Sequence, residues 1–331
     1  MSEAGIDIVE LIKRFNAGDR NALARAITII ESRAEDAKPL QNQLLNELKP
    51  SKKNTIRMAI SGPPGVGKST LINALGQHLL KKQFSVAILP IDPSSDVSMG
   101  SIMADKTRMR ALVNQDNIYI RPSPSKGSLG GVTRSTADVM FLVEAFGFDF
   151  IIVETLGVGQ AEWVAHWLSD HFVLLLQPGS GDQLQAMKMG ILEKADFILI
   201  NKADDEQKAL AEKSKNFLKS IKHRVNGDKP YVSTISALYD IGVDRFLQEL
   251  LDRHARKVSS GQLAKLRQDN RASLFDFLFD EILTEKLKQL PLYLDKRQSI
   301  AEKASSNSLP LTPTITFLVD ELCQNLSSWR A

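Results

Sequence analysis

Cysteine is almost absent from this sequence, which has Cys323 alone among its 331 residues. A single cysteine excludes an intrachain disulfide and a zinc site built from cysteines, and it fits a reducing compartment. Aromatic residues are also scarce, at 6% of the chain, and no basic patch is interleaved with them. Because Lys and Arg exceed Asp and Glu by only 3 (42 against 39), with both signs spread along the chain, we expect no nucleic-acid partner.

Long hydrophobic runs are missing as well. The apolar run at residues 172–176 has the length of a strand and is far too short to cross a bilayer. The first ten residues carry Glu3, Asp7 and Glu10 and lack the basic start and the apolar block of a signal peptide. We therefore expect a cytoplasmic protein with no membrane partner, and the 43% hydrophobic content is enough to build a core.

A glycine-rich turn at residues 57–70, R-M-A-I-S-G-P-P-G-V-G-K-S-T, joins an apolar strand to a helix. It matches G-x-x-x-x-G-K-[ST], the phosphate loop or P-loop, in the strand-to-helix context that this motif requires. Glycines let successive backbone N–H groups curl around a phosphate, and the helix N-terminus attracts the same anion. Lys68 is expected to reach the β- and γ-phosphates, and Ser69 to bind Mg²⁺. The nucleotide-binding residues predicted here are Gly62, Pro63, Pro64, Gly65, Val66, Gly67, Lys68, Ser69 and Thr70.

Strand-like apolar runs alternate with helical patterns from residue 57 to about residue 250. This alternation is typical of an α/β fold, with βαβ units and a parallel sheet covered on both faces. Ligands of such sheets bind outside the carboxyl ends of the strands. The strands are predicted at residues 57–61, 84–91, 118–121, 150–154, 172–177, 197–201 and 231–235.

The composition divides the chain into three parts. Residues 1–50 read as an N-terminal helical extension, and a polar, proline-interrupted linker leads from it into a P-loop domain at residues 51–250. Residues 251–331 form a C-terminal helical extension, which contains Phe275 and Phe279 and more apolar surface than a lone helical pair can hide. Either packing on the core or a homodimer arm would bury that surface. Its helices are predicted at 262–271, 274–290 and 311–329.

The segment N-K-A-D at residues 201–204 follows an apolar strand and matches N-K-x-D, the guanine reader of GTPases. The Asp204 carboxylate can accept hydrogen bonds from the ring N–H and the amino group of guanine, a pattern that adenine does not offer. A polar helix start with Asp204 as its N-cap is the alternative, but behind a P-loop the motif favours GTP and GDP as the bound nucleotides. The predicted base-binding residues are Asn201, Lys202 and Asp204, with Ser236, Ala237 and Leu238 from the loop after the last strand.

Acidic residues near strand ends are the candidates for a Mg²⁺ site beside Ser69. Glu154 ends a buried strand, at the place where GTPases put the Asp of D-x-x-G. A glutamate can hold Mg²⁺ directly or through water. Asp92 directly follows the predicted strand at residues 84–91, and Asp105 lies in the loop after Asp92. The alternative roles for these two residues are ordinary helix caps and solvated charges. The predicted metal-binding residues are Ser69, Asp92, Asp105 and Glu154.

No residue of the sequence is an obvious candidate for positioning the water that attacks the γ-phosphate. Gly157 is expected to present its backbone N–H to the γ-phosphate, within a second switch at residues 156–162. In Ras-like enzymes a glutamine directly follows the D-x-x-G glycine, whereas here Val158 does and Gln160 comes later. We therefore expect slow basal hydrolysis that a partner accelerates, with Arg108 as an in-chain candidate for positive charge. The predicted catalytic residues are Lys68, Glu154, Asp105 and Gln160.

Several segments of the chain resemble the MeaB/ArgK family, and they occur in the order of that family. They read G-P-P-G-V-G-K-S-T, I-D-P-S-S, D-K-T-R-M, I-R-P-S-P-S-K-G-S-L-G-G-V, V-E-T-L-G-V-G-Q-A-E, Q-P-G-S-G-D and N-K-A-D. Members of the family are G-protein chaperones of adenosylcobalamin-dependent methylmalonyl-CoA mutase, and they were long described as lysine-arginine-ornithine transport ATPases. Leu156, Ala161 and the loss of two glycines before D-K-T-R-M depart from the family's pattern in the switch segments.

The resemblance implies a P-loop GTPase core of the SIMIBI type, with a mostly parallel sheet, N-terminal helices and a C-terminal dimerisation extension. It also implies a homodimer that binds the mutase, gates delivery of the cobalamin cofactor by hydrolysing GTP, and protects or reactivates the enzyme. The residues carried over are Lys68 and Ser69 for phosphate and Mg²⁺, Asp92, Asp105 and Glu154 around the metal, Asn201, Lys202 and Asp204 for the base, and residues 177–188 as a third switch.

Three other functions compete with this one. A metallochaperone-type GTPase of nickel insertion would need a histidine-rich tract or paired cysteines; the five scattered histidines read instead as surface or packing residues. An ATPase or kinase accessory to amino-acid transport would need a base pocket indifferent to guanine, which N-K-A-D argues against. A membrane ATPase of the MinD type would want a second lysine early in the P-loop, where this chain has Pro63 and Pro64.

Overall fold

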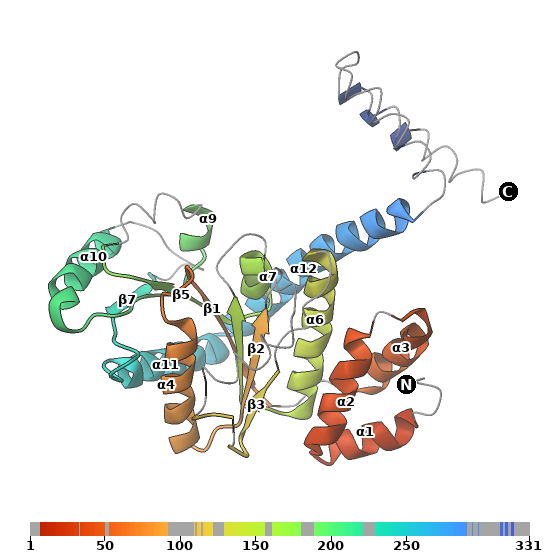
Figure 1. Ribbon diagram of the computed structural model, residues 1–331, viewed down its shortest axis with the longest axis horizontal. Coiled ribbons are helices and arrows are strands. Elements are labelled where there is room, and N and C mark those ends of the chain that lie inside the picture. The colour runs from red at the N-terminus through yellow and green to blue at the C-terminus, as the bar shows by residue number, and fades with distance from the viewer. Residues whose placement is uncertain are drawn as a thin grey trace. The chain divides into compact units, whose positions relative to one another are not determined.

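A parallel sheet of seven strands forms the centre of residues 1–274 in the computed structural model of the chain (Figure 1). The structure describes residues 7–32, 34–49, 53–91, 109, 111–113, 115–121, 129–155, 161–179, 189–220 and 229–289, together with 293, 297, 312–313, 315–316 and 319–320. In these residues, no helix combines the length and the hydropathy that crossing a membrane requires. The chain contains two compact units, residues 1–274 and residues 275–331, and the sheet belongs to the first.

The strands lie in the order β3-β2-β4-β1-β5-β6-β7, and every pair of neighbours is parallel. All seven predicted strands are confirmed, with ends that agree within two residues. Four of them are β1 (Ile56–Ser61), β4 (Phe150–Thr155), β5 (His171–Leu176) and β6 (Phe197–Ile200), and these are almost entirely buried. The other three are β2 (Val86–Ile91), β3 (Ile118–Ile120) and β7 (Tyr231–Thr234).

Helices cover both faces of this sheet, as the alternation of strand and helix patterns predicts (Figure 1). Helix α4 (Lys68–Lys81) and helix α11 (Val243–Ser259) share one hydrophobic core with the side chains of one sheet face. Helices α6 (Leu129–Phe146) and α7 (Ala161–Trp167) pack against the strands from the other side, and α10 (Lys208–Ser220) packs along β6 and β7. The short elements α9 (Met189–Leu192) and η2 (Asp205–Gln207) lie before β6 and α10.

Three helices and one short 3₁₀ turn precede the sheet, as predicted for residues 1–50. They are α1 (Ile8–Asn16), α2 (Arg20–Glu31), η1 (Glu35–Ala37) and α3 (Lys38–Glu47). Asp7 and Asp19 cap α1 and α2, because their carboxylates accept backbone N–H groups that a helix start leaves unpaired. Helix α2 packs on α6, and the Phe15 ring meets the Phe146 ring edge-on at 5.2 Å.

The C-terminal helices differ from the prediction in their continuity. Helix α11 passes through position 250, and α12 (Gln262–Lys288) is one helix of 27 residues, where two segments were predicted at 262–271 and 274–290. The residues between those segments, Ala272 and Ser273, include no glycine or proline that would stop a helix. The predicted helix at 311–329 falls mostly outside the described residues.

Buried polar groups tie α11 and the beginning of α12 to the amino ends of the central strands. The Arg267 guanidinium of α12 makes two 2.7 Å hydrogen bonds to the carboxylate of Asp170, which is fully buried. The backbone N–H of Arg57 in β1 also donates to Asp170, at 3.0 Å. On α11, the Lys257 ammonium donates to the Asp170 carbonyl at 2.8 Å and to the Asp196 carboxylate at 3.1 Å. The beginning of α12 therefore belongs to the first compact unit in its packing.

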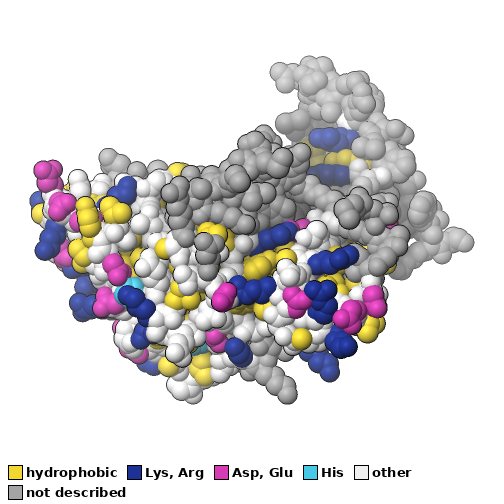
Figure 2. Space-filling view, turned by 60° about the horizontal axis from the view of Figure 1, so that its bottom comes forward, with side chains coloured by type: hydrophobic (Ala, Val, Ile, Leu, Met, Phe, Trp, Pro, Cys, Tyr) yellow, Lys and Arg dark blue, Asp and Glu magenta, His cyan; other side chains and the backbone are white. Residues whose placement is uncertain are grey.

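The described surface carries charges of both signs. On the face that Figure 2 shows, Lys and Arg side chains are interspersed with Asp and Glu side chains, and hydrophobic side chains are scattered among them. This agrees with the even spread of charge along the sequence.

Candidate functional site

The P-loop leaves the carboxyl end of β1, at the centre of the sheet, and enters α4. Gly62, Gly65 and Gly67 all have positive φ, at 149°, 74° and 100°. A Cβ at Gly62 would lie 2.3 Å from the Leu175 carbonyl oxygen, and a Cβ at Gly67 would lie 2.4 Å from the Asn201 side-chain nitrogen. Glycine is therefore required at these two positions both by backbone conformation and by the close approach of neighbouring groups.

Lys68, the first residue of α4, points its ammonium back into the P-loop. Its Nζ donates to the carbonyl oxygens of Gly62 and Pro63, at 2.6 and 3.1 Å. Burial lowers the pKa of Lys68, and the nearby carboxylates of Glu154 and Glu162 oppose that shift. The loop thus holds a poorly solvated cation where a phosphate would arrive, which is an arrangement suited to an anion.

Ser69 and Glu154 lie together beside this lysine. The Ser69 hydroxyl donates a 2.9 Å hydrogen bond to Glu154 Oε1. Glu154 is opposite Ile60 in the pairing of β4 with β1, so its side chain faces the beginning of α4. The structure therefore brings together two of the four predicted metal-binding residues.

Asn201 joins the P-loop to the loop after β7. Its side-chain Nδ2 donates to the Val66 carbonyl at 2.8 Å, and its Oδ1 accepts the backbone N–H of Ala237 at 2.9 Å. The Asn201 side chain is buried, so both bonds are shielded from water. One asparagine thus fixes the distance between the phosphate-binding segment and the predicted base-binding segment.

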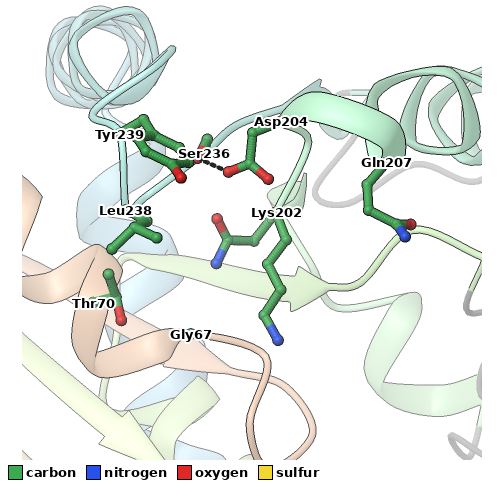
Figure 3. A pocket seen from close by; sticks show the side chains of 9 residues that line it. Gly67, Thr70, Lys202, Asp204, Gln207, Ser236, Leu238 and Tyr239 are labelled. Carbon is green, nitrogen blue, oxygen red and sulfur yellow. Dashed lines mark hydrogen bonds between the residues drawn. The ribbon is translucent and has the colours of Figure 1, made fainter.

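A cavity of about 330 Å³ opens beside this asparagine (Figure 3). The Asp204 carboxylate lies in its wall and accepts a short hydrogen bond from the Ser236 hydroxyl. The volume is in the range of cavities that hold small ligands. The cavity is lined by Gly67, Thr70, Asn201, Lys202, Asp204, Gln207, Ser236, Leu238 and Tyr239.

Seven of the residues that line the cavity were predicted from sequence, and two were not. Gln207 comes from η2, and Tyr239 directly follows the predicted segment Ser236-Ala237-Leu238. Neither residue belongs to a motif, although an aromatic side chain next to a base-binding loop is a signal that could have been used. Ala237 contributes its backbone N–H to the site rather than a lining side chain.

Glu162 is a further residue to which sequence reasoning gave no role of its own. It is buried at the beginning of α7, and its Oε1 accepts a 2.8 Å hydrogen bond from the Ser61 hydroxyl at the end of β1. Its charge acts on Lys68. The usable signal was an acid that opens an apolar helix shortly after the strand ending in Glu154.

Several predicted residues lie outside the described part of the chain. They are Asp92, Asp105, Arg108, Gly157, Gln160 and most of the third-switch segment at 177–188. Their roles stay predictions.

Comparison with known proteins identifies the family. The model of the family described as "Methylmalonyl Co-A mutase-associated GTPase MeaB" matches residues 23–291. "GTPase ArgK" of Escherichia coli (strain K12) is 39% identical over 265 residues, 79% of this chain and 80% of that protein. "Methylmalonic aciduria type A homolog, mitochondrial" of Mus musculus is 37% identical over 306 residues, 88% of this chain and 74% of that protein.

A solved structure agrees with these matches. The crystal structure of an LAO/AO transport system kinase is similar with a TM-score of 0.75 and 29% sequence identity, over 97% of this chain and 99% of that one. The P-loop at the end of β1 and the parallel sheet described above are features of such a nucleotide-binding fold. The chain is thus a P-loop GTPase and belongs to the MeaB family.

Proposed function

We propose that this protein is a GTP-hydrolysing, Mg²⁺-dependent switch that acts as a G-protein chaperone of adenosylcobalamin-dependent methylmalonyl-CoA mutase. The observation that carries the nucleotide part is the connection made by Asn201, which bonds the P-loop at Val66 and the base loop at Ala237. A ligand that spans both segments needs a phosphate group at one end and a base at the other. GTP and GDP have that form.

For guanine, the proposal assigns recognition to Asp204. Its carboxylate lies in the wall of the cavity, and the hydrogen bond from Ser236 orients it. An ionised carboxylate only accepts hydrogen bonds, so it matches the two N–H donors on the guanine edge and repels the acceptor that adenine presents there. Lys202 and Leu238 line the same cavity and would contact the faces of the base.

For the phosphates, we assign the P-loop backbone and Lys68. The ammonium of Lys68 bonds two loop carbonyls, and a triphosphate would offer it stronger, charged acceptors. Because burial already makes the charged form of Lys68 costly, exchanging neutral carbonyls for an anion is favourable at this site.

The residues beside the P-loop fit a Mg²⁺ ion. Ser69 and Glu154 present a hydroxyl and a carboxylate oxygen within 2.9 Å of each other, and oxygen ligands of this kind are those that Mg²⁺ prefers. Asp92 and Asp105 complete the proposed set. When bound, the ion would neutralise charge on the β- and γ-phosphates. Gln160, Arg108 or a residue of the partner is proposed to assist hydrolysis.

The mutase as client is supported by the description of the matching family model. We also propose a cytoplasmic homodimer whose arm is formed by the second unit. Its helix exposes large apolar side chains, and the rings of Phe275 and Phe279 stack at 6.0 Å. In a monomer these apolar side chains would be exposed to water, which is unfavourable, and contact with a second copy would bury them. The exposed residues concerned are Phe275, Phe279, Ile282 and Leu283.

The test is GTP turnover by the purified protein, alone and with the methylmalonyl-CoA mutase of the same organism, in Mg²⁺ buffer. We expect slow turnover that rises when the mutase is added, together with a complex on a sizing column. If GTP turnover is the same with and without the mutase, and no complex forms, the mutase is not the client. ATP in place of GTP is the matched control, and equal turnover of ATP would contradict the guanine assignment.

A further inference from the structure

We propose that His78 and Asp240 are a positioning pair that fastens the base loop to the P-loop helix and so strengthens the hold on the nucleotide base. The base loop is defined here as residues 236–241. This inference rests on the proposed function, because it takes the cavity at Asp204 to be the guanine site. Neither His78 nor Asp240 lines that cavity.

The root of the base loop is fixed by backbone bonds. Ser236 and Ile241 exchange two hydrogen bonds, at 3.0 and 2.9 Å, so the residues between them form one tight turn. Ala237, next to the root, is held by Asn201. The tip is less enclosed: Leu238 is 73% exposed and Tyr239 is 59% exposed, although both line the cavity. The position of these two side chains therefore depends on what restrains the tip.

His78 of α4 supplies such a restraint. Its Nε2 lies 2.7 Å from Oδ1 and 2.9 Å from Oδ2 of Asp240, across 162 residues of sequence. Because a carboxylate only accepts hydrogen bonds, His78 Nε2 carries the proton and donates it. The His78 side chain is 18% exposed, so the bond is partly shielded from water.

The backbone at Asp240 suits this role. Asp240 has φ of 56°, a left-handed conformation that Asp and Asn tolerate better than other residues with a side chain. Directly after Leu238 and Tyr239, this turn directs the carboxylate onto α4. His78 lies ten residues beyond Lys68 on α4, about 15 Å along the helix axis, so the pair is remote from the phosphate end of the site.

These positions predict that loss of the pair weakens binding of the base and leaves binding of the phosphates unchanged. If the pair is lost, the tip of the base loop can pivot on the Ser236–Ile241 root, and contacts of Leu238 and Tyr239 with the base and ribose weaken. The phosphates are held at the other end of α4, by the P-loop. Affinity for a whole nucleotide should therefore fall while affinity for its phosphate part does not.

The experiment compares binding of GDP and of inorganic triphosphate to the full-length protein by calorimetry. For His78→Ala we expect GDP to bind about two- to fivefold more weakly, in line with the loss of one partly exposed hydrogen bond, and inorganic triphosphate to bind as in the wild type. His78→Gln places an amide N–H at similar reach and should restore most of the GDP affinity. Asp240→Asn in the His78→Ala background should add little, because the bond is already gone.

The matched control is Arg14→Ala, which breaks an exposed ion pair with Asp19 in the N-terminal helices and should change neither affinity. Equal weakening of GDP and triphosphate in His78→Ala would mean that α4 itself is disturbed, and would overturn the proposal. Unchanged GDP affinity would overturn it as well. A wild-type protein that binds ADP as tightly as GDP would instead contradict the proposed function, so the two failures are distinguishable.

Discussion

Ser69 of α4 and Glu154 of β4 share a hydrogen bond of 2.9 Å, from the serine hydroxyl to Oε1 of the glutamate. The bond joins the first turn of the P-loop helix to the end of the strand next to β1. Both groups offer oxygen atoms of the kind that bind Mg²⁺. In the proposed function, Ser69 and Glu154 would instead hold Mg²⁺ when a nucleotide is bound.

This contact predicts that Ser69→Ala and Glu154→Gln lose the effect of Mg²⁺ on nucleotide affinity. In the wild type we expect Mg²⁺ to tighten GTP binding by on the order of tenfold or more, and in either variant we expect GTP affinities in Mg²⁺ and in EDTA to differ by less than about threefold, because a Mg²⁺ ligand is missing. Fluorescence titration with a labelled GTP analogue measures both conditions.

A similar serine–glutamate pair provides the control. Ser61 donates to Glu162 at 2.8 Å, but from the side of the sheet that α7 covers. Ser61→Ala should lower stability by about 1–3 kcal/mol, since it leaves a buried acceptor without its donor, yet keep the response to Mg²⁺. A full Mg²⁺ response in Ser69→Ala and Glu154→Gln would remove both residues from the metal site.

We predict that Asp204→Asn changes the preferred base from guanine to xanthine. The amide of asparagine presents a donor where the carboxylate accepted, which matches the 2-oxo group of xanthine and opposes the amino group of guanine. GTP affinity should fall on the order of 100-fold, and the affinity for xanthosine triphosphate should exceed it. Competition between the two nucleotides measures the change.

Asp205→Asn is the neighbouring control for this prediction. Asp205 is exposed and has φ of 43°, which asparagine also tolerates, so the substitution makes the same chemical change outside the cavity. It should leave the preference for guanine intact. If Asp204→Asn binds GTP like the wild type, another residue reads the base.

The sequence allowed prediction of the parts of this molecule that depend on local pattern. Runs rich in Ile, Val, Leu and Phe, each followed by a turn, mark all seven strands, and their burial on both faces explains why they read as continuous apolar segments. The P-loop and N-K-A-D lie at the ends of β1 and β6. The sheet order, with β1 and β6 on either side of β5, brings those two motifs to the same edge.

Contacts between residues far apart in the chain could not be predicted from one sequence. His78 and Asp240 are 162 residues apart, and Ser61 and Glu162 are 101 residues apart. Each residue alone reads as an ordinary polar position in a helix or turn. The histidines read as scattered for the same reason, although His171 and His254 are bonded to each other at 3.2 Å inside the protein. Such pairs follow from tertiary packing, which periodicity does not encode.

The buried histidines predict that stability falls in mild acid. Burial lowers the pKa of His171 well below its usual 6.5, lowers the pKa of His254, and lowers that of His166 to about 4. These histidines stay neutral in the folded protein, while in the unfolded chain they bind protons as the pH drops through 6.5. Since the unfolded state then holds more protons, each such histidine lowers the free energy of unfolding as the pH falls from 6.5 toward its own folded pKa, by at most about 1.4 kcal/mol per pH unit in that window.

The hydrogen bonds near β5 decide which ring nitrogen of the neutral His171 carries the proton. Lys257 has donors only and lies 3.5 Å from His171 Nδ1, so this nitrogen accepts and His171 Nε2 donates to His254 Nδ1. Denaturant unfolding at pH 7.5, 6.5 and 5.5 tests the prediction, and His254→Gln, which keeps an acceptor for His171, should show a shallower loss of stability. A stability that does not change between pH 7.5 and 5.5 would contradict it.

The proposed dimer arm is the second unit, which begins at Phe275. Truncation after Leu274 removes the second unit but keeps Arg267 and the buried bonds that it makes to Asp170. We expect a monomer by light scattering that still binds GDP, because the exposed apolar residues of α12 beyond this point are gone. A double substitution in the full chain, Phe275→Ser with Phe279→Ser, should also give monomers. A dimer that persists in both would move the interface elsewhere.

A second truncation, after Ser259, separates loss of the arm from damage to the GTPase unit. It removes Arg267 as well and leaves the fully buried carboxylate of Asp170 without its main counter-charge. Breaking a buried pair from one side costs about 3–5 kcal/mol, so this shorter protein should unfold at a clearly lower denaturant concentration than the chain ending at Leu274. Equal stability of the two truncations would mean that the beginning of α12 contributes nothing to the fold, in contradiction to its hydrogen bonds with Asp170 and with the Ser169 carbonyl.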